Sequence, residues 1–360
     1  MTEGRGRGPV PRRLSAVLGG ADRLVGLDAA RGLALLGMFV AHVAPTTQER
    51  LVDGRSAILF AVITGMSVGL LTPRPAATGV DAAAPPPSPR GSPFLTIAIR
   101  GTALLLLGLV LLLLRPPLAV ILDVYGLGLL LLVPVLRAPR VVLAVLAAVA
   151  VVGGPLAIAA IDAAGVAGLP LPVVLLDYWF AGGAYPLLLW IGYLLVGLLL
   201  ARCDLRRLRT RVGMLVGGAA ASAAGYGAAT QLPGVDASAH ADTTAEALGS
   251  GGLAVALVAA LLLLGDLPGR VGDAIRVVLL PIAAAGAMPL TLYVAHVLVL
   301  AGFAAANGGA ILPVEYPGWL LPALLLGAPI LATAWRLLIG RGPLEAGMRA
   351  LARATGRRRP

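Results

Sequence analysis

Apolar runs long enough to cross a lipid bilayer recur along nearly the whole of this 360-residue chain. A helix of about twenty predominantly apolar residues spans the hydrocarbon core of a membrane. Hydrophobic residues make up 59% of the sequence and charged residues only 12%. That charged share is about half of what an ordinary soluble domain carries. The pattern predicts an all-α protein, a polytopic integral membrane helix bundle whose first partner is the lipid bilayer.

The apolar runs divide the chain into about ten candidate transmembrane helices. They lie near residues 26–44, 56–72, 94–114, 118–136, 141–161, 184–201, 212–230, 250–266, 278–304 and 318–338. The run 278–304 is interrupted by Pro281 and Pro289. It is therefore either one helix or a short re-entrant piece followed by a helix.

Arginine supplies all 28 basic residues, and its distribution predicts an orientation in the membrane. Arginine-rich segments alternate along the chain with loops that carry little or no basic charge, such as 162–183, 231–249 and 305–317. Cytoplasmic loops of membrane proteins are enriched in basic residues. The alternation therefore predicts that both termini are cytoplasmic, in a multi-pass protein of the plasma membrane.

The same pattern of apolar runs and basic segments predicts a domain organisation. We expect a basic cytoplasmic tail over residues 1–25, a transmembrane domain over 26–340 and a second basic tail over 341–360. Residues 73–93 are rich in proline and alanine and are predicted to form a disordered cytoplasmic linker. Asp28 and Arg31 interrupt the first apolar run near its start, so we interpret that run as a retained helix rather than a signal peptide.

Charge and cysteine content exclude several kinds of partner. The formal net charge is +11, but the arginines lie in short loops and tails between the spans, which argues against nucleic-acid binding. Cys203 is the one cysteine, so neither an internal disulfide nor a cysteine-based metal site is expected. No metal site is predicted, and the sequence does not indicate an oligomeric state.

The first predicted helix carries ionisable residues where a membrane span normally has none. The stretch "DAARGLALLGMFVAHV" holds Asp28, Arg31 and His42. Asp28 and Arg31 are three residues apart and can pair on one helix face. His42 follows Arg31 by eleven residues, which is about three turns and roughly 16 Å of rise, and so returns to nearly the same face. Because buried charges are costly in a bilayer, this stripe favours a polar interior.

A second polar cluster occurs in "GAMPLTLYVAHVLVL", where Tyr293 and His296 share a helix face. The third histidine, His240, falls in a predicted outer loop and is expected to be solvated. Other polar groups lie within or at the ends of spans: Asp53, Arg55, Arg100, Asp123, Tyr125 and Arg336. Charges spread over several helices predict a shared polar cavity.

Three stretches carry a family resemblance. "RLVGLDAARGLALLGMFVAHV", "AYPLLLWIGYLLVGLLLAR" and "GAMPLTLYVAHVLVL" occur in this order, and "RGPLEAGMRAL" follows them. They resemble the transmembrane acyltransferase superfamily, in particular the bacterial proteins similar to the heparan-alpha-glucosaminide N-acetyltransferase catalytic domain. The spacing of Arg31 and His42 is also similar to the acyltransferase-3 family, where the histidine at this place is regarded as catalytic.

The chain departs from the heparan-type pattern at several positions. Those members generally have Asn where His42 stands, and their catalytic histidine lies in the following loop, whereas "APTTQERLVDGR" contains none. Leu189 replaces the proline before Trp190, and Ala287 replaces an arginine of the late helix. The resemblance therefore implies acyl transfer without implying a heparan substrate.

The resemblance implies a membrane-bound acyltransferase that uses acyl-CoA, with acetyl-CoA as the expected donor. His42 is the predicted general base, and His296 a second catalytic residue that, with Tyr293, orients the acceptor or polarises the thioester. Asp28, Arg31 and Arg100 are predicted at the donor. Predicted acceptor-binding residues are Asp53, Arg55, Asp123, Tyr125, Asp177, Tyr185, Trp190 and Tyr293. The acceptor is expected to be a glycan, a lipid-linked sugar or a small metabolite.

Two other interpretations stay open. In a transporter or lipid exporter, the polar cavity would serve passage, and Asp28, His42 and Asp123 would couple protons. An inverted repeat would favour that class, and none is evident in the sequence. A structural membrane subunit without catalytic chemistry is the third interpretation.

Overall fold

A computed structural model describes residues 24–44, 51–72, 92–165, 168–307 and 315–356, and these residues form helices and connecting loops without a strand. The predicted linker, apart from residues 92–93, and most of the predicted N-terminal tail lie outside the described residues. The helices are α2 (Val25–Val43), α4 (Arg55–Leu71), α5 (Pro93–Leu113), α6 (Leu122–Leu132), α7 (Arg140–Ala164), α8 (Leu171–Phe180), α9 (Leu187–Ala201), α10 (Leu208–Gln231), α11 (Thr244–Gly265), α12 (Gly269–Gly286), α13 (Pro289–Ala306), α14 (Leu320–Leu338) and α15 (Pro343–Gly356), with a short 3-10 helix at Val133–Val135.

Seven of these helices are long and apolar enough to cross a membrane: α2, α5, α7, α10, α11, α13 and α14. The shorter apolar helices α4 and α9 correspond to two further predicted spans, and α6 with the 3-10 helix corresponds to a third. The chain is therefore a polytopic, all-α membrane protein. The number of ten spans and the side on which the termini lie stay predictions.

The predicted segment 278–304 is two helices. Pro281 lies inside α12, whereas the chain breaks at Ala287 and Met288, and Pro289 begins α13. Proline suits the first turn of a helix because the amide it lacks has no intrahelical partner there. The break agrees with the second alternative, but α12 has 18 residues and starts at Gly269, so it is not a short piece, and a re-entrant path stays a prediction.

Two helices lie where the sequence analysis expected none. The predicted outer loop 162–183 contains α8, and the predicted C-terminal tail contains α15. α8 is a ten-residue helix without a fully buried residue, and α15 is amphipathic rather than uniformly apolar. Neither has the long apolar run that marks a span, which explains why the hydropathy pattern missed both.

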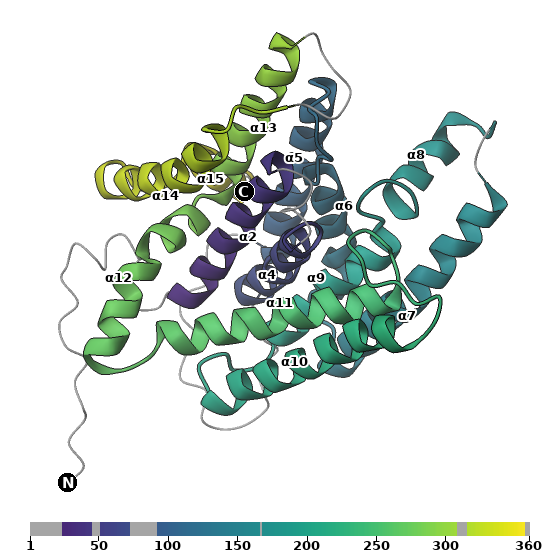
Figure 1. Cartoon of the computed structure of the whole chain (residues 1–360), viewed down its shortest axis with the longest axis horizontal. Coiled ribbons are helices and arrows are strands. Elements are labelled where there is room, and N and C mark those ends of the chain that lie inside the picture. The colour runs from purple at the N-terminus through teal and green to yellow at the C-terminus, as the bar shows by residue number, and fades with distance from the viewer. Residues whose placement is uncertain (1–23, 45–50, 73–91, 166–167, 308–314, 357–360) are drawn as a thin grey trace.

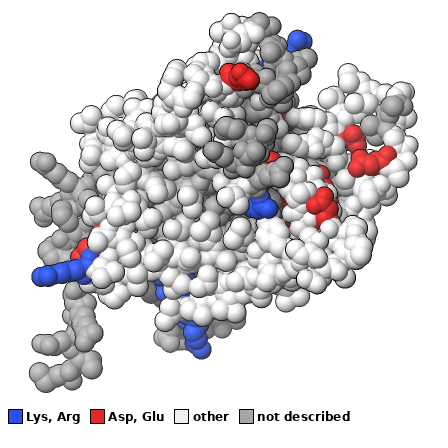
Figure 2. Space-filling model, viewed as in Figure 1, with Lys and Arg blue, Asp and Glu red and all other residues white. Residues whose placement is uncertain are grey.

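Figure 1 shows α2 and α4 surrounded by the other helices, with α10 and α11 side by side along one edge and α13, α14 and α15 at another. α2 packs on α4, α11 and α12, and α4 packs on α9. Outward-facing residues of α5, α7 and α14 are largely leucine, isoleucine and valine. The surface in Figure 2 is correspondingly dominated by uncharged residues. Such a surface matches a lipid environment.

Glycines allow helix backbones to touch at the centre of the bundle. A Cβ added at Gly32 would lie 1.9 Å from the carbonyl oxygen of Ile282, and one at Gly286 would lie 1.9 Å from that of Asp28. These close approaches hold α2 against α12. Small residues at helix crossings are typical of membrane bundles because packing, rather than the hydrophobic effect, drives association there.

The two GxxxG spacings have different environments. A Cβ at Gly65 would meet the carbonyl oxygen of Leu194 at 2.0 Å, and one at Gly69 would meet Ala201 at 2.5 Å, so this pair packs on α9. Gly213 and Gly217 have no atom within 4 Å of an added Cβ. The first motif serves plain packing, and the second packs against nothing among the described residues.

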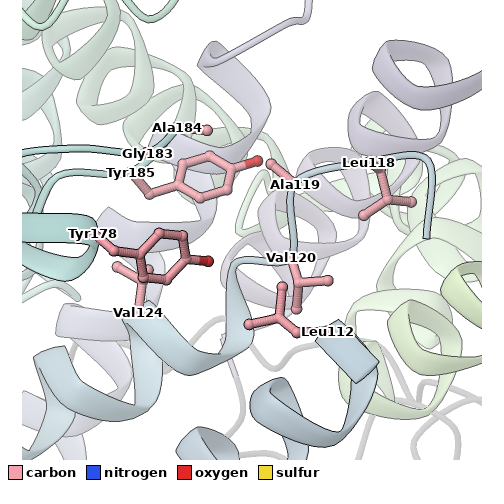
Figure 3. A pocket seen from close by; sticks show the side chains of 9 residues that line it. All are labelled: Leu112, Leu118, Ala119, Val120, Val124, Tyr178, Gly183, Ala184 and Tyr185. Carbon is pink, nitrogen blue, oxygen red and sulfur yellow. The ribbon is translucent and has the colours of Figure 1, made fainter. Parts of the chain in front are cut away.

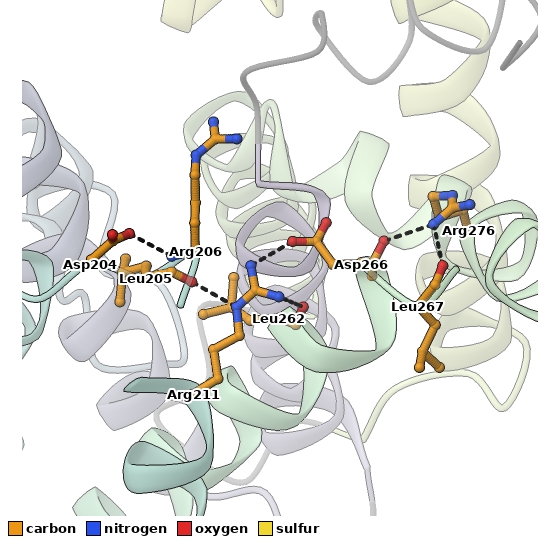
Figure 4. A network of polar contacts seen from close by, with 9 residues as sticks. Asp204, Leu205, Arg206, Arg211, Leu262, Asp266, Leu267 and Arg276 are labelled. Atoms are coloured by element: carbon orange, nitrogen blue, oxygen red, sulfur yellow. Dashed lines mark hydrogen bonds and ion pairs between the residues drawn. The ribbon is translucent and has the colours of Figure 1, made fainter. Parts of the chain in front are cut away.

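Buried arginines tie helix ends together. The guanidinium of Arg211 donates to the carbonyls of Leu205 at 2.6 Å and Leu262 at 3.0 Å, and to the Asp266 carboxylate at 2.5 Å (Figure 4). Nearby, Arg276 donates to the Leu267 carbonyl at 2.9 Å. Cations near the C-terminus of a helix satisfy its last carbonyls and complement its dipole. These arginines therefore close the end of α11 as well as contributing basic charge.

A second buried arginine joins three segments. Arg202, which is 5% exposed, donates to the carbonyl and hydroxyl oxygens of Thr72 and to the carbonyl of Leu136. Arg140 in turn donates to the carbonyl of Arg202. The end of α4, the 3-10 helix and the start of α7 are thereby held beside the end of α9.

The α10–α11 contact gives a stability prediction with a neighbouring control. A Cβ at Gly218 would lie 2.7 Å from backbone atoms of both Gly252 and Ala256, whereas Gly217 faces open space. Overpacking of this kind costs about 1–3 kcal/mol. We expect Gly218→Val to lower the thermal unfolding temperature in detergent and Gly217→Val to leave it nearly unchanged. Equal effects of the two variants would contradict this packing.

Candidate active site

His42 of α2 and His296 of α13 meet, although 254 residues separate them in the chain. His42 Nδ1 lies 3.0 Å from His296 Nε2. The two rings are nearly coplanar, with an interplanar angle of 3° and centroids 5.2 Å apart. His296 is 1% exposed, and the ring of Phe39 packs on it at 4.8 Å. The two predicted catalytic histidines therefore form a single unit, the histidine pair.

Hydrogen bonding fixes which ring nitrogens of the pair carry protons. His296 Nδ1 lies 2.7 Å from the carbonyl oxygen of Tyr293. A carbonyl can only accept, so Nδ1 of His296 carries a proton, and in the neutral ring its Nε2 accepts. His42 must then donate from Nδ1 to His296 Nε2. The Nε2 atom of His42 is consequently left with a lone pair, which is the state a general base requires.

Of two buried tyrosines, Tyr293 contacts the histidine pair and Tyr125 links α6 to α4. The hydroxyl of Tyr293 accepts a hydrogen bond from the amide of Ile121 at 3.3 Å, and its ring lies edge-on to His296. Tyr125 donates to the carbonyl of Ala57 at 2.7 Å. These bonds join α6, α4 and α13. Both predicted tyrosines thus have polar partners already.

His240 is not the solvated surface residue that the sequence analysis expected. Its side chain is 29% exposed, its Nε2 lies 3.3 Å from the carboxylate of Asp53, and its Nδ1 lies 2.9 Å from the carbonyl of Ala184. Both ring nitrogens face acceptors, so the imidazolium form of His240 can donate to both. Tyr185 packs edge-on to His240, and Trp190 to Tyr185, at centroid distances of 5.7 and 4.9 Å.

The loop that presents His240 has an unusual backbone. His240 and Asp242 have left-handed φ angles of 59° and 51°, which are uncommon outside glycine. The Glu246 carboxylate accepts from the backbone amides of both residues at 2.8 Å, and Thr243 accepts from the Glu246 amide at 3.0 Å. The sequence analysis did not identify Glu246. The Thr-x-x-Glu spacing of a capping box is the signal that would have marked it.

Electrostatics couple this loop to the histidine pair. The hydrogen bond from His240 lowers the pKa of Asp53 against the opposing effect of burial, and proximity to His42 lowers it further. The pKa of His240 is raised, first by its hydrogen bond to Asp53. Burial, with the neighbouring Glu246, raises the pKa of Asp242 to about 7. The ion pair Asp53–His240 therefore lies within electrostatic range of His42.

A small open cavity of about 160 Å³ adjoins these residues. It is lined by Leu112, Leu118, Ala119, Val120, Val124, Tyr178, Gly183, Ala184 and Tyr185. Figure 3 shows the hydroxyl groups of Tyr178 and Tyr185 on the same side of it. Tyr185 connects the cavity to His240, and Val120 precedes Ile121, which bonds to Tyr293.

Asp123 is buried close to this cavity, immediately before Val124 in α6. One carboxylate oxygen, Oδ2, accepts from the indole of Trp179 at 3.1 Å. The other, Oδ1, has no hydrogen-bond partner among the described residues. An unsatisfied buried carboxyl oxygen is costly, so this position marks a polar site rather than a packing position.

The predicted donor residues are engaged elsewhere. Arg31 pairs with Asp28 at 3.0 Å and also donates to the carbonyl of Gly286 at 3.1 Å and the hydroxyl of Ser67 at 2.7 Å. The residue thus ties α2 to α12 and α4. Arg100 lies on α5, which packs chiefly on α6 and α15 rather than beside Arg31. The structure brings Asp28 and Arg31 together and places Arg100 on another helix, and their part in donor binding stays a prediction.

Two further predicted acceptor residues, Arg55 and Asp177, lie on α4 and α8. Arg55 donates to the hydroxyl of Tyr226 at 2.7 Å, which in turn lies 2.9 Å from the hydroxyl of Ser250. Asp177 is half-buried on α8, two residues before Trp179. Their predicted part in acceptor binding stays a prediction.

Within the described residues, no group of three or more histidine, cysteine, aspartate or glutamate side chains is placed to hold a metal ion. Comparison of the chain with models of protein families, with curated proteins and with solved structures finds no match. The function must therefore be argued from the site itself.

The Asp53–His240 pair predicts a pH-dependent stability. The raised pKa of His240 gives stability that is complete below its ordinary value of 6.5 and is lost as pH rises through the raised value. The lowered pKa of Asp53 gives stability present above 3.8 and lost as pH falls. We expect His240→Gln to lower the unfolding temperature most between about pH 4 and pH 6.5.

Asp242 serves as a control because its side chain, unlike that of His240, destabilises the fold when it ionises. Its raised pKa gives stability that is lost as pH rises from 3.8 to about 7. Asp242→Asn should therefore gain in thermal stability relative to wild type across that range, and asparagine accepts the left-handed φ. Unfolding temperatures of His240→Gln that differ from wild type by the same amount at every pH would contradict the ion pair.

Proposed function

We propose that this protein is a membrane-bound acyltransferase that moves an acyl group, most simply acetyl, from acyl-CoA to a hydroxyl or amine. The observation that carries the proposal is the histidine pair. Nε2 of His42 has a lone pair, and Nδ1 of His42 donates a hydrogen bond to Nε2 of His296. His296 is buried and is itself fixed by its hydrogen bond to the Tyr293 carbonyl. A neutral imidazole in a fixed tautomer is suited to general-base catalysis near neutral pH. The family resemblance of the three sequence stretches supports the same class.

The proposed step uses the pair as follows. The acceptor oxygen or nitrogen attacks the thioester carbonyl and gives its proton to Nε2 of His42. The carbon–sulfur bond then breaks, and the proton passes from His42 to the departing CoA sulfur. During the step His42 is an imidazolium, and its Nδ1 proton stays bonded to His296 Nε2, which disperses the charge.

The acceptor is proposed to bind at the cavity beside Tyr178 and Tyr185. Its volume of about 160 Å³ is below the range typical of pockets that enclose a whole ligand. It therefore suits the reacting end of a larger acceptor, as in a glycan or a lipid-linked sugar, or a small metabolite. Tyr185 lines this cavity and packs edge-on to His240, whose partner Asp53 lies within electrostatic range of His42.

The proposed membrane arrangement has ten spans, cytoplasmic termini and a donor that enters from the cytoplasmic side of the plasma membrane. The arrangement of charges supports it. The start of α2 contacts α11 near Leu261 and Leu262, and Arg211 donates to the Leu262 carbonyl at that end. The far end of α2, at His42, adjoins the Asp53–His240 pair instead. The Arg211–Asp266 pair thus lies toward the start of α2 and the Asp53–His240 pair toward its far end, and the orientation itself is proposed from the arginine-poor loops of the sequence.

A proton-coupled transporter is a second candidate, and Asp123 is the observation that favours it. Its carboxyl group is fully buried and has one oxygen without a partner among the described residues. Intramembrane carboxyl groups of this kind are typical of proton-coupled transport.

The acyltransferase proposal, unlike the transporter, requires His42 for the transfer of label. We expect His42→Ala to lower the transfer of radiolabel from acetyl-CoA into the glycan and lipid fractions of expressing cells about 100-fold or more, since a general base contributes about 10²–10⁴ in rate. Asn307→Ala, which removes a polar group at the exposed end of the same helix as His296, should retain wild-type transfer. Thermal unfolding should show that both variants are folded.

Wild-type transfer by His42→Ala would overturn the assignment of the base. Failure of the wild-type protein to bind labelled acetyl-CoA would overturn the acyltransferase proposal. In that case, uptake of protons that depends on Asp123 would support the transporter.

A further inference from the structure

The break between α12 and α13 exposes two helix ends inside the bundle. α12 ends at Gly286 and α13 begins at Pro289. The last carbonyls of one helix and the first amides of the next have no intrahelical partner. In a membrane protein such groups must be satisfied by the protein or by water in a cavity.

Charged side chains of opposite sign, from α2 and α15, form hydrogen bonds with backbone groups at these two helix ends. Arg31 of α2 donates to the carbonyl of Gly286 at 3.1 Å. On the other side, the carboxylate of Glu345 in α15 accepts from the amides of Leu290 at 2.8 Å and Thr291 at 3.1 Å. A cation at a helix C-terminus and an anion at a helix N-terminus are the signs that the helix dipoles favour.

The contact between α15 and α13 is reinforced by the Thr291 side chain. Its hydroxyl donates to Glu345 at 2.6 Å and accepts from the amide of Leu344 at 3.2 Å. One carboxylate and one hydroxyl thus make four hydrogen bonds between the first turns of two helices. We call this group, Glu345 with Thr291, the α13 clamp.

The clamp lies close to the histidine pair along the same helix. His296 follows Thr291 by five residues, which is about 7.5 Å along the helix axis. The carbonyl of Tyr293, which accepts a hydrogen bond from Nδ1 of His296, lies between them. α13 packs on its neighbours α2, α12 and α15 over short stretches, and Leu298 and Val299 are exposed. The clamp is therefore a principal constraint on how the first half of α13 is placed.

We infer that Glu345 is a positioning residue for the histidine pair: by fixing the first turn of α13, it keeps His296 Nε2 within hydrogen-bond distance of His42 Nδ1. The C-terminal helix α15 is thereby part of the proposed active site, although it does not touch the reacting atoms. The catalytic meaning of this inference rests on the proposed function. The geometric part does not, because the histidine pair can be observed without any activity.

The first experiment observes the histidine rings directly. The chain has three histidines, so a protein labelled with ¹⁵N-histidine in detergent gives a spectrum that His42→Gln, His240→Gln and His296→Gln can assign. In the wild type we expect His42 and His296 each to carry the proton on Nδ1. In Glu345→Ala we expect both rings to shift toward averaged tautomers, while His240 keeps its wild-type signals.

Two further variants distinguish loss of the positioning contact from a general disruption of the fold. Glu345→Gln retains an oxygen that accepts from the α13 amides and should preserve more of the wild-type histidine signals than Glu345→Ala. Glu315→Ala removes an exposed carboxylate elsewhere and should change none of them. Wild-type histidine signals in Glu345→Ala would overturn the inference, and so would an equal change in all three histidines.

The second experiment measures acyl transfer. Glu345→Ala should lower label transfer from acetyl-CoA about 10- to 100-fold, the range expected when a reacting group is displaced by about an ångström. Glu345→Gln should recover part of it. Unchanged transfer in Glu345→Ala would overturn the positioning role. If the wild-type protein transfers no label, the proposed function fails, whereas the histidine spectra still decide the geometry.

Discussion

The structure depends on the need to give every buried polar group a partner inside an apolar bundle. Water is scarce there, and an unsatisfied amide, carbonyl or charge is costly. The chain meets this need at helix ends: Arg211 binds carbonyls at the end of α11, Arg31 binds the end of α12 and Glu345 binds the start of α13. Most of the interior ionisable groups are thus structural. The histidine pair differs because Nε2 of His42, like Oδ1 of Asp123, has no hydrogen-bond partner among the described residues.

Close backbone contacts make these bonds possible. Gly32 and Gly286 let α2 and α12 approach until backbone atoms of the two helices touch. That approach places Arg31 within reach of the last carbonyl of α12 and sets the start of α13 against α2. A larger residue at either glycine would separate the helices and, with them, the two halves of the histidine pair. Packing and site geometry are therefore not independent in this protein.

The sequence predicted the fold class, most helices and the common helix face of Tyr293 and His296, because hydropathy and helical spacing act locally. Contacts between distant segments had no such local signal. The hydrogen bond between His42 and His296 depends on how α2 and α13 cross. The inward position of His240 depends on two left-handed residues and on Glu246, six positions away. A run of polar residues in a loop does not reveal either feature, so His240 was predicted to be solvated.

The direction of the hydrogen bonds through the histidine pair has a consequence for proton movement. A relay needs an acceptor that can bind a proton and pass it on, yet the last partner of this short chain is the peptide carbonyl of Tyr293. That oxygen is too weakly basic to be protonated near neutral pH. A proton captured by His42 has no onward route through His296 and must leave by the way it came. This arrangement suits a reaction in which His42 takes up a proton and releases it on the same side, rather than the transport of protons across a membrane.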